Sequence, residues 1–215
     1  MKLTKWEHAC MVCEVETERL VIDPGAFTSP LEGLTNVRGI VITHEHWDHW
    51  TPEQLGRIVA LNPNVRVFGT AATADAAREK GVEVPIDVVH AGDSIELGPF
   101  RLRFFGGRHA IIHSSIPQID NVGVMVNDTL YYPGDSFALP GVEVPVLAAP
   151  ASAPWMKSAE TMDFILEVKP RIVIQAHEMV NSQLGNDMMT ARMTWCAEQV
   201  SGSHRWLAPG ESIDL

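Results

Sequence analysis

Short β-branched hydrophobic runs recur along the first half of the chain and alternate with helix-like segments. The run at 39–43 predicts a buried strand, and the run at 65–68 predicts another. Each precedes a helix-start signal, Thr51 in the first case and Thr70 in the second, and the second helix is expected to stop at Gly81. This alternation predicts a parallel part of a β-sheet.

The remaining segments are richer in strand patterns. Residues 3–22 predict two strands joined as a hairpin. From residue 82 onward, turn signals separate further candidate strands, at 86–90, 94–97, 100–105, 121–127, 129–132, 144–147, 171–176 and 206–207. Two more helices are predicted, at 158–169 and 186–200. The candidate strands between 86 and 132 form a meander that would build the second sheet of a sandwich.

The run HEHWDH at 44–49 directly follows the first of these strands. Side chains at i, i+2 and i+4 of an extended segment project to one side, so His44, His46 and Asp48 are expected to converge as ligands of a transition metal. The change from loop to helix would point His49 toward a second metal position, although a mononuclear site stays open. The alternative is a loop with surface histidines.

This spacing, His-x-His-x-Asp-His, resembles the signature of the metallo-β-lactamase superfamily. The family's other motifs each find a candidate in the same order along the chain: Asp23, His109, Asp135 and His177. The resemblance implies an α/β fold, a four-layered αββα sandwich in which two mixed β-sheets pack face to face with helices on the outside. Residues 1–215 would form this single domain.

The resemblance also implies a role for each motif residue. The ligands of a first divalent ion would be His44, His46 and His109. The ligands of a second ion would be Asp48, His49 and His177. Asp135 would bridge the two ions, and Asp23 would support the metal loops without touching metal. Zinc is expected, with manganese or iron as alternatives, because the donors are nitrogen and carboxylate groups.

Two of these positions carry open alternatives. Asp135 follows a strand-like run and the turn Pro133-Gly134, where its two carboxylate oxygens could bridge two ions, but aspartate is also common in such turns. His113 lies in the long irregular stretch 106–120 and would be a proton donor near the leaving group, a partner of a metal ligand, or an ordinary polar residue. Three tryptophans would line the pocket or pack in the core: Trp47, Trp50 and Trp155.

The expected reaction is hydrolysis. A metal-activated hydroxide, bridging the two ions, would cleave an ester, lactone or amide bond of a small substrate, with Asp48, Asp135 and His113 as catalytic residues. The Gly-x-His-Ala form of the third motif, with His113 beyond it, resembles the lactonase-type hydrolases related to ascorbate-6-phosphate lactonase. Two alternatives stay open: a phosphodiesterase or nuclease on the same centre, and a non-enzymatic metal-binding sensor.

Composition and net charge limit the classes of partner that the protein is expected to bind. At 215 residues and 46% hydrophobic content the chain can bury a sizeable core, which excludes a disordered protein. A net charge of −11 without a Lys/Arg cluster argues against nucleic acid and favours a small-molecule partner, while the oligomeric state stays open. No apolar run suits a signal peptide or a membrane span, so a cytoplasmic protein is expected.

The cysteines are interpreted as packing residues. Cys10 and Cys13 lie in a strand-like segment, where i and i+3 face opposite sides. A redox or zinc-binding pair is the alternative.

Overall fold

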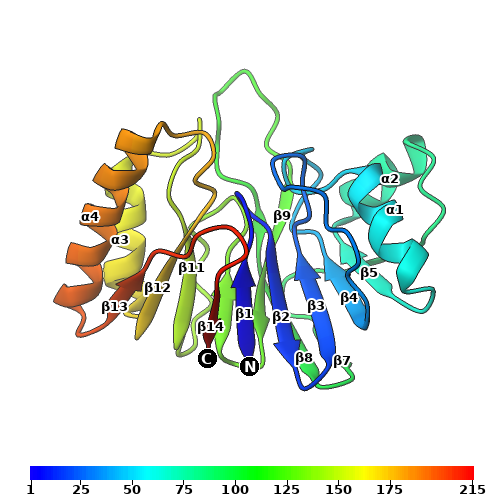
Figure 1. Ribbon diagram of the computed structural model, residues 1–215. Helices are drawn as coiled ribbons and strands as arrows, with labels where there is room; N and C mark the ends of the chain where they lie inside the picture. The colour runs from blue at the N-terminus through cyan, green and yellow to red at the C-terminus, as the bar shows by residue number, and fades with distance from the viewer.

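Two seven-stranded β-sheets pack face to face in the computed structural model, which describes all 215 residues (Figure 1). The first sheet has the order β14-β1-β2-β3-β4-β5-β6 and the second the order β13-β12-β11-β10-β9-β8-β7. In the first sheet β1, β2 and β3 are antiparallel, whereas β3 to β6 are parallel. In the second, β10 to β13 are parallel and β7 to β10 antiparallel. Both sheets are therefore mixed, as the resemblance implies, but β6, expected in the second sheet, lies at the edge of the first, beside β5.

The strands of the first sheet are β1 (Lys2–Lys5), β2 (Met11–Val15), β3 (Glu18–Ile22), β4 (Val37–Val41), β5 (Arg66–Gly69), β6 (Ile86–Val88) and β14 (Ser212–Asp214). The strands of the second sheet are β7 (Ser94–Leu97), β8 (Phe100–Arg108), β9 (Asp120–Val126), β10 (Leu130–Tyr132), β11 (Val146–Pro150), β12 (Ile172–Ala176) and β13 (Ser203–Arg205).

Four helices form the outer layers: α1 (Pro52–Leu61), α2 (Ala71–Glu79), α3 (Ser158–Val168) and α4 (Gln183–Gln199). Helices α1 and α2 cover the first sheet, and α3 and α4 cover the second (Figure 1). The start signals act as predicted, because the side chains of Thr51 and Thr70 each accept a hydrogen bond from the backbone three residues later. The predicted αββα sandwich is confirmed. None of the four helices combines the length and the hydrophobicity that a membrane span requires.

Three hydrophobic cores lie between the four layers of helices and sheets. The largest, with 21 buried residues, lies between the sheets, and one of 13 residues lies under each helical layer. Cys13 packs in the central core and Cys10 in the core under α1, and both are fully buried. Their packing role on opposite faces is thus confirmed.

Three strand predictions need correction. Residues 3–22 form three strands rather than a two-stranded hairpin, because the chain turns at 6–10, where Trp6 N donates to Cys10 O at 2.9 Å. No strand forms at 206–207, since this segment connects β13 in one sheet to β14 in the other. The strand expected at 144–147 begins only at Val146, after Pro145, which has no amide proton to donate.

The strands that precede the predicted site residues all end at one edge of the sandwich. These strands are β3, β4, β8, β10 and β12. At this edge the loop between β8 and β9 rises above both sheets, at the top of Figure 1. The fold therefore gathers residues from distant parts of the sequence at a single rim.

Candidate metal centre

Eight side chains that could bind metal ions meet at this rim in two groups of four. One group consists of His44, His46, His109 and Asp135, and the other of His8, Asp48, His49 and His177. Within each group the potential ligand atoms all lie within 4.8 Å of one another. The structure thus brings together all seven residues predicted to bind metal and adds His8, which the sequence interpretation missed.

In the first group, the rings of His44 and His109 are held from behind by Thr43 and by the carbonyl of Ala110. His44 Nε2 lies 3.0 Å from His46 Nδ1, and His109 Nε2 lies 3.4 Å from Asp135 Oδ2. The outer nitrogen Nδ1 of His109 lies 2.6 Å from the carbonyl of Ala110. Such contacts fix the ring orientation that metal-binding histidines need.

The second group surrounds one carboxylate oxygen. Asp48 Oδ2 lies 3.2 Å from His8 Nε2, 3.6 Å from His177 Nε2 and 3.9 Å from His49 Nε2. His177 is oriented by Ser152, whose carbonyl lies 2.5 Å from its Nδ1. Three imidazole nitrogens therefore face a single oxygen.

Asp135 connects the two groups. Its Oδ2 lies 3.4 Å from His109 Nε2 and 3.2 Å from His177 Nε2, and its Oδ1 lies 3.2 Å from His49 Nε2. Trp155 Nε1 donates a hydrogen bond of 2.8 Å to Oδ2. The carboxylate thus contacts histidines of both groups.

The run 44–49 is not extended, which corrects the expected convergence of His44, His46 and Asp48. His49 N donates to His46 O at 3.1 Å, and this turn sends Asp48 into the other group. The turn packs tightly against Gly25, where a Cβ atom would lie 1.7 Å from Asp48 O. Glycine is therefore required beneath the loop.

Asp23 supports both sides of the loop from behind. Its carboxylate accepts hydrogen bonds from Thr43 N at 2.8 Å and from Thr43 Oγ1 at 2.7 Å, and it pairs with His49 Nδ1 at 2.6 Å. Thr43 Oγ1 also lies 3.0 Å from His44 Nδ1. Asp23 therefore contacts the second group directly and the first only through Thr43.

The two groups differ in their electrostatics. Burial, together with the neighbouring His49, lowers the pKa of His44 well below its ordinary value. Burial works against the charged form of His49 too, yet Asp135 and Asp23 raise its pKa well above the ordinary value. Against the effect of burial, the hydrogen bond from His8 lowers the pKa of Asp48 to about 2. Burial lowers the pKa of His8 itself to about 4.

Unpartnered polar atoms indicate that these groups are built for a ligand. Four buried potential ligand atoms of the cluster have no hydrogen-bond partner: His49 Nε2, His109 Nε2, Asp135 Oδ1 and His177 Nε2. His8 Nδ1 is also unpartnered, but it is the other nitrogen of His8, Nε2, that faces Asp48. Burying a polar atom in this way costs about 1–3 kcal/mol each, so native proteins rarely do it without a reason. Imidazole and carboxylate donors suit a divalent transition-metal ion, and the residues present fit such ions.

The other predicted residues lie outside these groups. His113 is exposed in the β8–β9 loop, where its Nδ1 lies 2.7 Å from Ser115 Oγ. Trp50 is fully buried in the core under α1 and Trp47 is exposed, whereas Trp155 contacts Asp135. Of the three tryptophans, only Trp155 thus touches a potential metal ligand.

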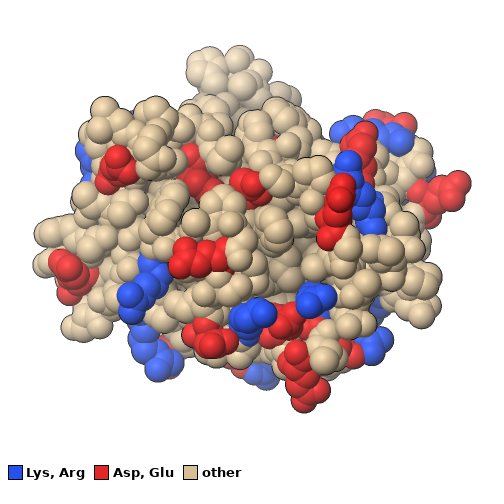
Figure 2. Space-filling model, in the orientation of Figure 1, with Lys and Arg blue, Asp and Glu red and all other residues tan.

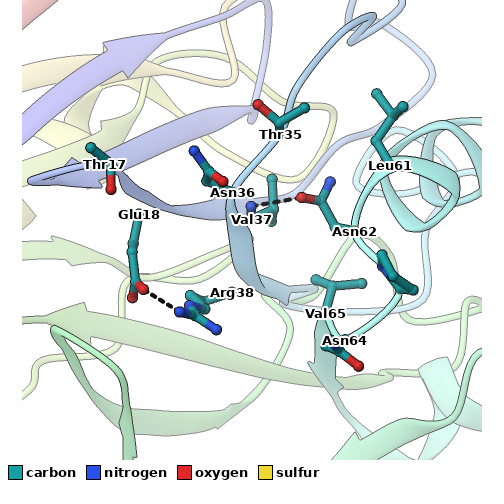
Figure 3. Close-up of a pocket in the computed structure, with 11 residues that line it drawn as sticks. Thr17, Glu18, Thr35, Asn36, Val37, Arg38, Leu61, Asn62, Asn64 and Val65 are labelled. Atoms are coloured by element: carbon teal, nitrogen blue, oxygen red, sulfur yellow. Dashed lines mark hydrogen bonds and ion pairs between the residues drawn. The ribbon is translucent and has the colours of Figure 1, made fainter.

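A surface cavity of about 530 Å³ lies at the opposite end of β4, beside the end of α1 (Figure 3). Three of its polar side chains, Asn62, Arg38 and Glu18, are already paired. Asn62 accepts from Val37 N and donates to the carbonyls of Leu34 and Ile58, and Arg38 pairs with Glu18. No unpartnered polar group of the kind found in the metal-binding groups lines this cavity.

Comparison with known proteins identifies the family. Residues 2–177 match the β-lactamase superfamily domain. Protein Rv0786c of Mycobacterium tuberculosis is 36% identical over 90% of this chain and 92% of its own. A UPF0173 protein of Pyrococcus furiosus is 27% identical over 82% of this chain and 83% of its own.

Solved structures agree on the fold. Igni18, a metallo hydrolase from the archaeon Ignicoccus hospitalis, superposes with a TM-score of 0.75 at 16% identity, covering 99% of this chain and 97% of its own. The domain match covers most of the chain, and the mycobacterial relative matches nearly all of it. The protein therefore belongs to the metallo-β-lactamase superfamily.

Proposed function

We propose that this protein is a hydrolase that uses two divalent metal ions, most simply zinc, with manganese or iron as the alternatives. The observation that carries the proposal is the position of Asp135, whose carboxylate contacts histidines of both groups. In this proposal His44, His46 and His109 would hold one ion, Asp48, His49 and His177 would hold the other, and Asp135 would be shared by both. The activity named for Igni18 supports the same reaction class.

The chemistry follows from this arrangement. When bound, such ions lower the pKa of water and polarise the bond that is to be cleaved. The chain's own contribution is to fix the donors: Asp23 and Ser152 hold His49 and His177 from behind. Trp155 holds the carboxylate of Asp135 through its indole N–H. These contacts place the ligands before the substrate arrives, which reduces the reorganisation needed during reaction.

The surroundings support an uncharged ester, lactone or amide substrate over a phosphodiester. Residues 109–119, the loop above the site, contain no Lys, Arg, Asp or Glu, and its crest at the top of Figure 2 carries no charged side chain. Apolar side chains beside the proposed ligands are exposed, with Trp47 at 55%, Ile111 at 64% and Met179 at 47%. Sites for phosphate groups usually present Lys or Arg instead. A lactonase-type activity fits this rim.

Metal analysis coupled to a substrate panel tests the proposal. The purified protein should contain two equivalents of metal and hydrolyse at least one member of a panel of esters, lactones, amides and phosphodiesters. Asp135→Ala should bind less than one equivalent and lose activity, because it removes the carboxylate shared by both groups. Asp75→Ala, which changes an exposed carboxylate on α2, is the control.

A protein that binds no transition metal would contradict the proposal. A protein loaded with two equivalents but inactive on the whole panel would instead support the metal-binding sensor. Activity confined to phosphodiesters would favour the phosphodiesterase alternative.

A further inference from the structure

His8 occupies a place in the second group that the family signature does not explain. It lies in the turn between β1 and β2 and is fully buried. Its Nε2 lies 3.2 Å from Asp48 Oδ2, and its ring centroid lies 3.8 Å from that of His177. A histidine distant in sequence from every motif thus faces two proposed ligands of the second ion.

The distances fit shared coordination of one ion. Donor atoms around a tetrahedral zinc ion, with bonds of about 2.0–2.1 Å, lie about 3.3 Å apart. Asp48 Oδ2 lies at 3.2 Å from His8 Nε2, and this is shorter than its distances to the nitrogens of His177 and His49, 3.6 and 3.9 Å. By this measure His8 is at least as well placed as the two signature histidines.

The backbone around His8 is held in an unusual conformation. His8 has a φ of 58°, and His177, whose N–H donates to His8 O at 2.9 Å, has a φ of 60°. Residues other than glycine adopt this left-handed region at a cost that the surrounding structure must offset. Here Glu178 offsets part of it, because its Oε1 accepts from His8 N at 2.8 Å.

A buried ion pair fixes this contact in turn. Lys5 Nζ lies 3.2 Å from both carboxylate oxygens of Glu178, and Lys5 is only 1% exposed. Burying a charged lysine costs free energy unless the lysine is paired. The Lys5–Glu178 pair therefore holds the segment after β1 against the loop that carries His177. If His8 only packed against its neighbours, neither the Glu178 contact with its backbone nor the Lys5–Glu178 pair would be needed.

We propose that His8 is a fourth protein ligand of the second metal ion, beside Asp48, His49 and His177. The inference rests on the two-ion centre proposed above. With Asp135 shared, the second ion would then have five protein donors and the first ion four. Because the first ion would have one protein donor fewer, it would be the ion with more room to contact the substrate.

Cobalt(II) titration tests this proposal. The protein is freed of metal with a chelator and titrated with cobalt(II) ions while the visible absorption is recorded. Wild type should take up two equivalents. His8→Gln should keep the first equivalent and bind the second more weakly by over about a hundredfold, which exceeds the roughly tenfold to hundredfold loss caused by removing an outer partner of a ligand, with a changed absorption band. His204→Gln is the matched control, because burial likewise lowers the pKa of His204 to about 4 but it belongs to neither group.

Glutamine separates a ligand from a positioning residue. Its amide can still hydrogen-bond to Asp48, so a second equivalent with wild-type affinity and spectrum in His8→Gln would overturn the proposal. His8→Asn is the second variant, since asparagine tolerates the left-handed backbone of this position. If wild type itself takes up fewer than two equivalents, the two-ion centre fails, which is a different result.

A measurement on the unaltered protein guards against variants that do not fold. Imidazole N–H protons of histidines bound to cobalt(II) are strongly shifted in proton NMR spectra. With both ions bound, six such histidines are expected if His8 is a ligand. Five shifted signals would contradict the proposal.

Discussion

The two metal-binding groups lie side by side and share Asp135, yet they are built differently. The first takes three histidines from two strand ends and keeps them in place through short local contacts, such as that of His109 with Ala110. The second takes its donors from three segments and depends on polar contacts with the rest of the protein, including buried Asp23 and Glu178. The second group should therefore be the more sensitive to changes in its surroundings.

Gly25→Ala should produce the largest difference between the two groups in metal binding. The new Cβ would lie 1.7 Å from Asp48 O, so the loop carrying Asp48 and His49 must move. Overpacking of this kind typically costs about 1–3 kcal/mol or more. We expect a lower melting temperature and loss of the second metal equivalent, with the first retained, as measured by calorimetric titration.

Gly56→Ala is the matched control, because a Cβ at this helical position meets nothing within 4 Å. It should leave both equivalents intact and slightly stabilise α1. Equal retention of two equivalents by Gly25→Ala and its control would show that the loop can adjust, and the proposed difference between the groups would be wrong.

Asp23→Asn should sharpen the comparison. Asparagine keeps an acceptor for Thr43 N but presents an amide where His49 Nδ1 needs an acceptor. Loss of such a partner typically weakens metal binding by about tenfold to a hundredfold. The dissociation constant of the second metal ion should rise by this factor. That of the first ion should rise less, because Asp23 contacts His44 only through Thr43. Asp128→Asn, at a half-buried turn where Asp128 pairs with Arg101 and Arg103, should change neither constant. An equal rise in both constants would argue against this division.

Trp155→Phe should have the smallest effect and should not discriminate between the groups. Phenylalanine keeps an aromatic ring but removes the N–H that donates to Asp135 Oδ2. A hydrogen bond contributes about 0.5–1.5 kcal/mol, so both affinities should fall by roughly threefold to tenfold. Trp206→Phe, at an exposed tryptophan, is the control. An effect on one ion alone would mean that Asp135 is not shared.

Most of the fold could be predicted because its signals are local. Thr51 and Thr70 mark their helix starts through side-chain caps, and β-branched runs mark the buried strands. The seven predicted ligands follow from a spacing signature and from strand ends that share an edge. Their division into two groups is predicted only through the family resemblance. It depends on the turn between His46 and His49, which the alternation of an extended segment cannot reveal.

His8 was missed because residues 3–22 were interpreted as one hairpin. The N-terminal segment instead turns at 6–10, and β1 and β3 are both antiparallel to β2. Strand β1 therefore runs in the same direction as β3 and ends at the same rim, three residues before His8. The only local signal for this break is a polar pair, Glu7-His8, inside an apolar stretch, and a side chain that meets its partners about 40 or 170 residues away leaves no spacing pattern.

The most direct test of the central claim is a crystal structure of the metal-loaded protein with anomalous scattering measured at the metal edge. The account predicts two anomalous peaks on either side of Asp135, one beside His44, His46 and His109 and the other beside Asp48, His49 and His177, roughly 3.5–4 Å apart. A single peak, or peaks that Asp135 does not touch, would contradict it.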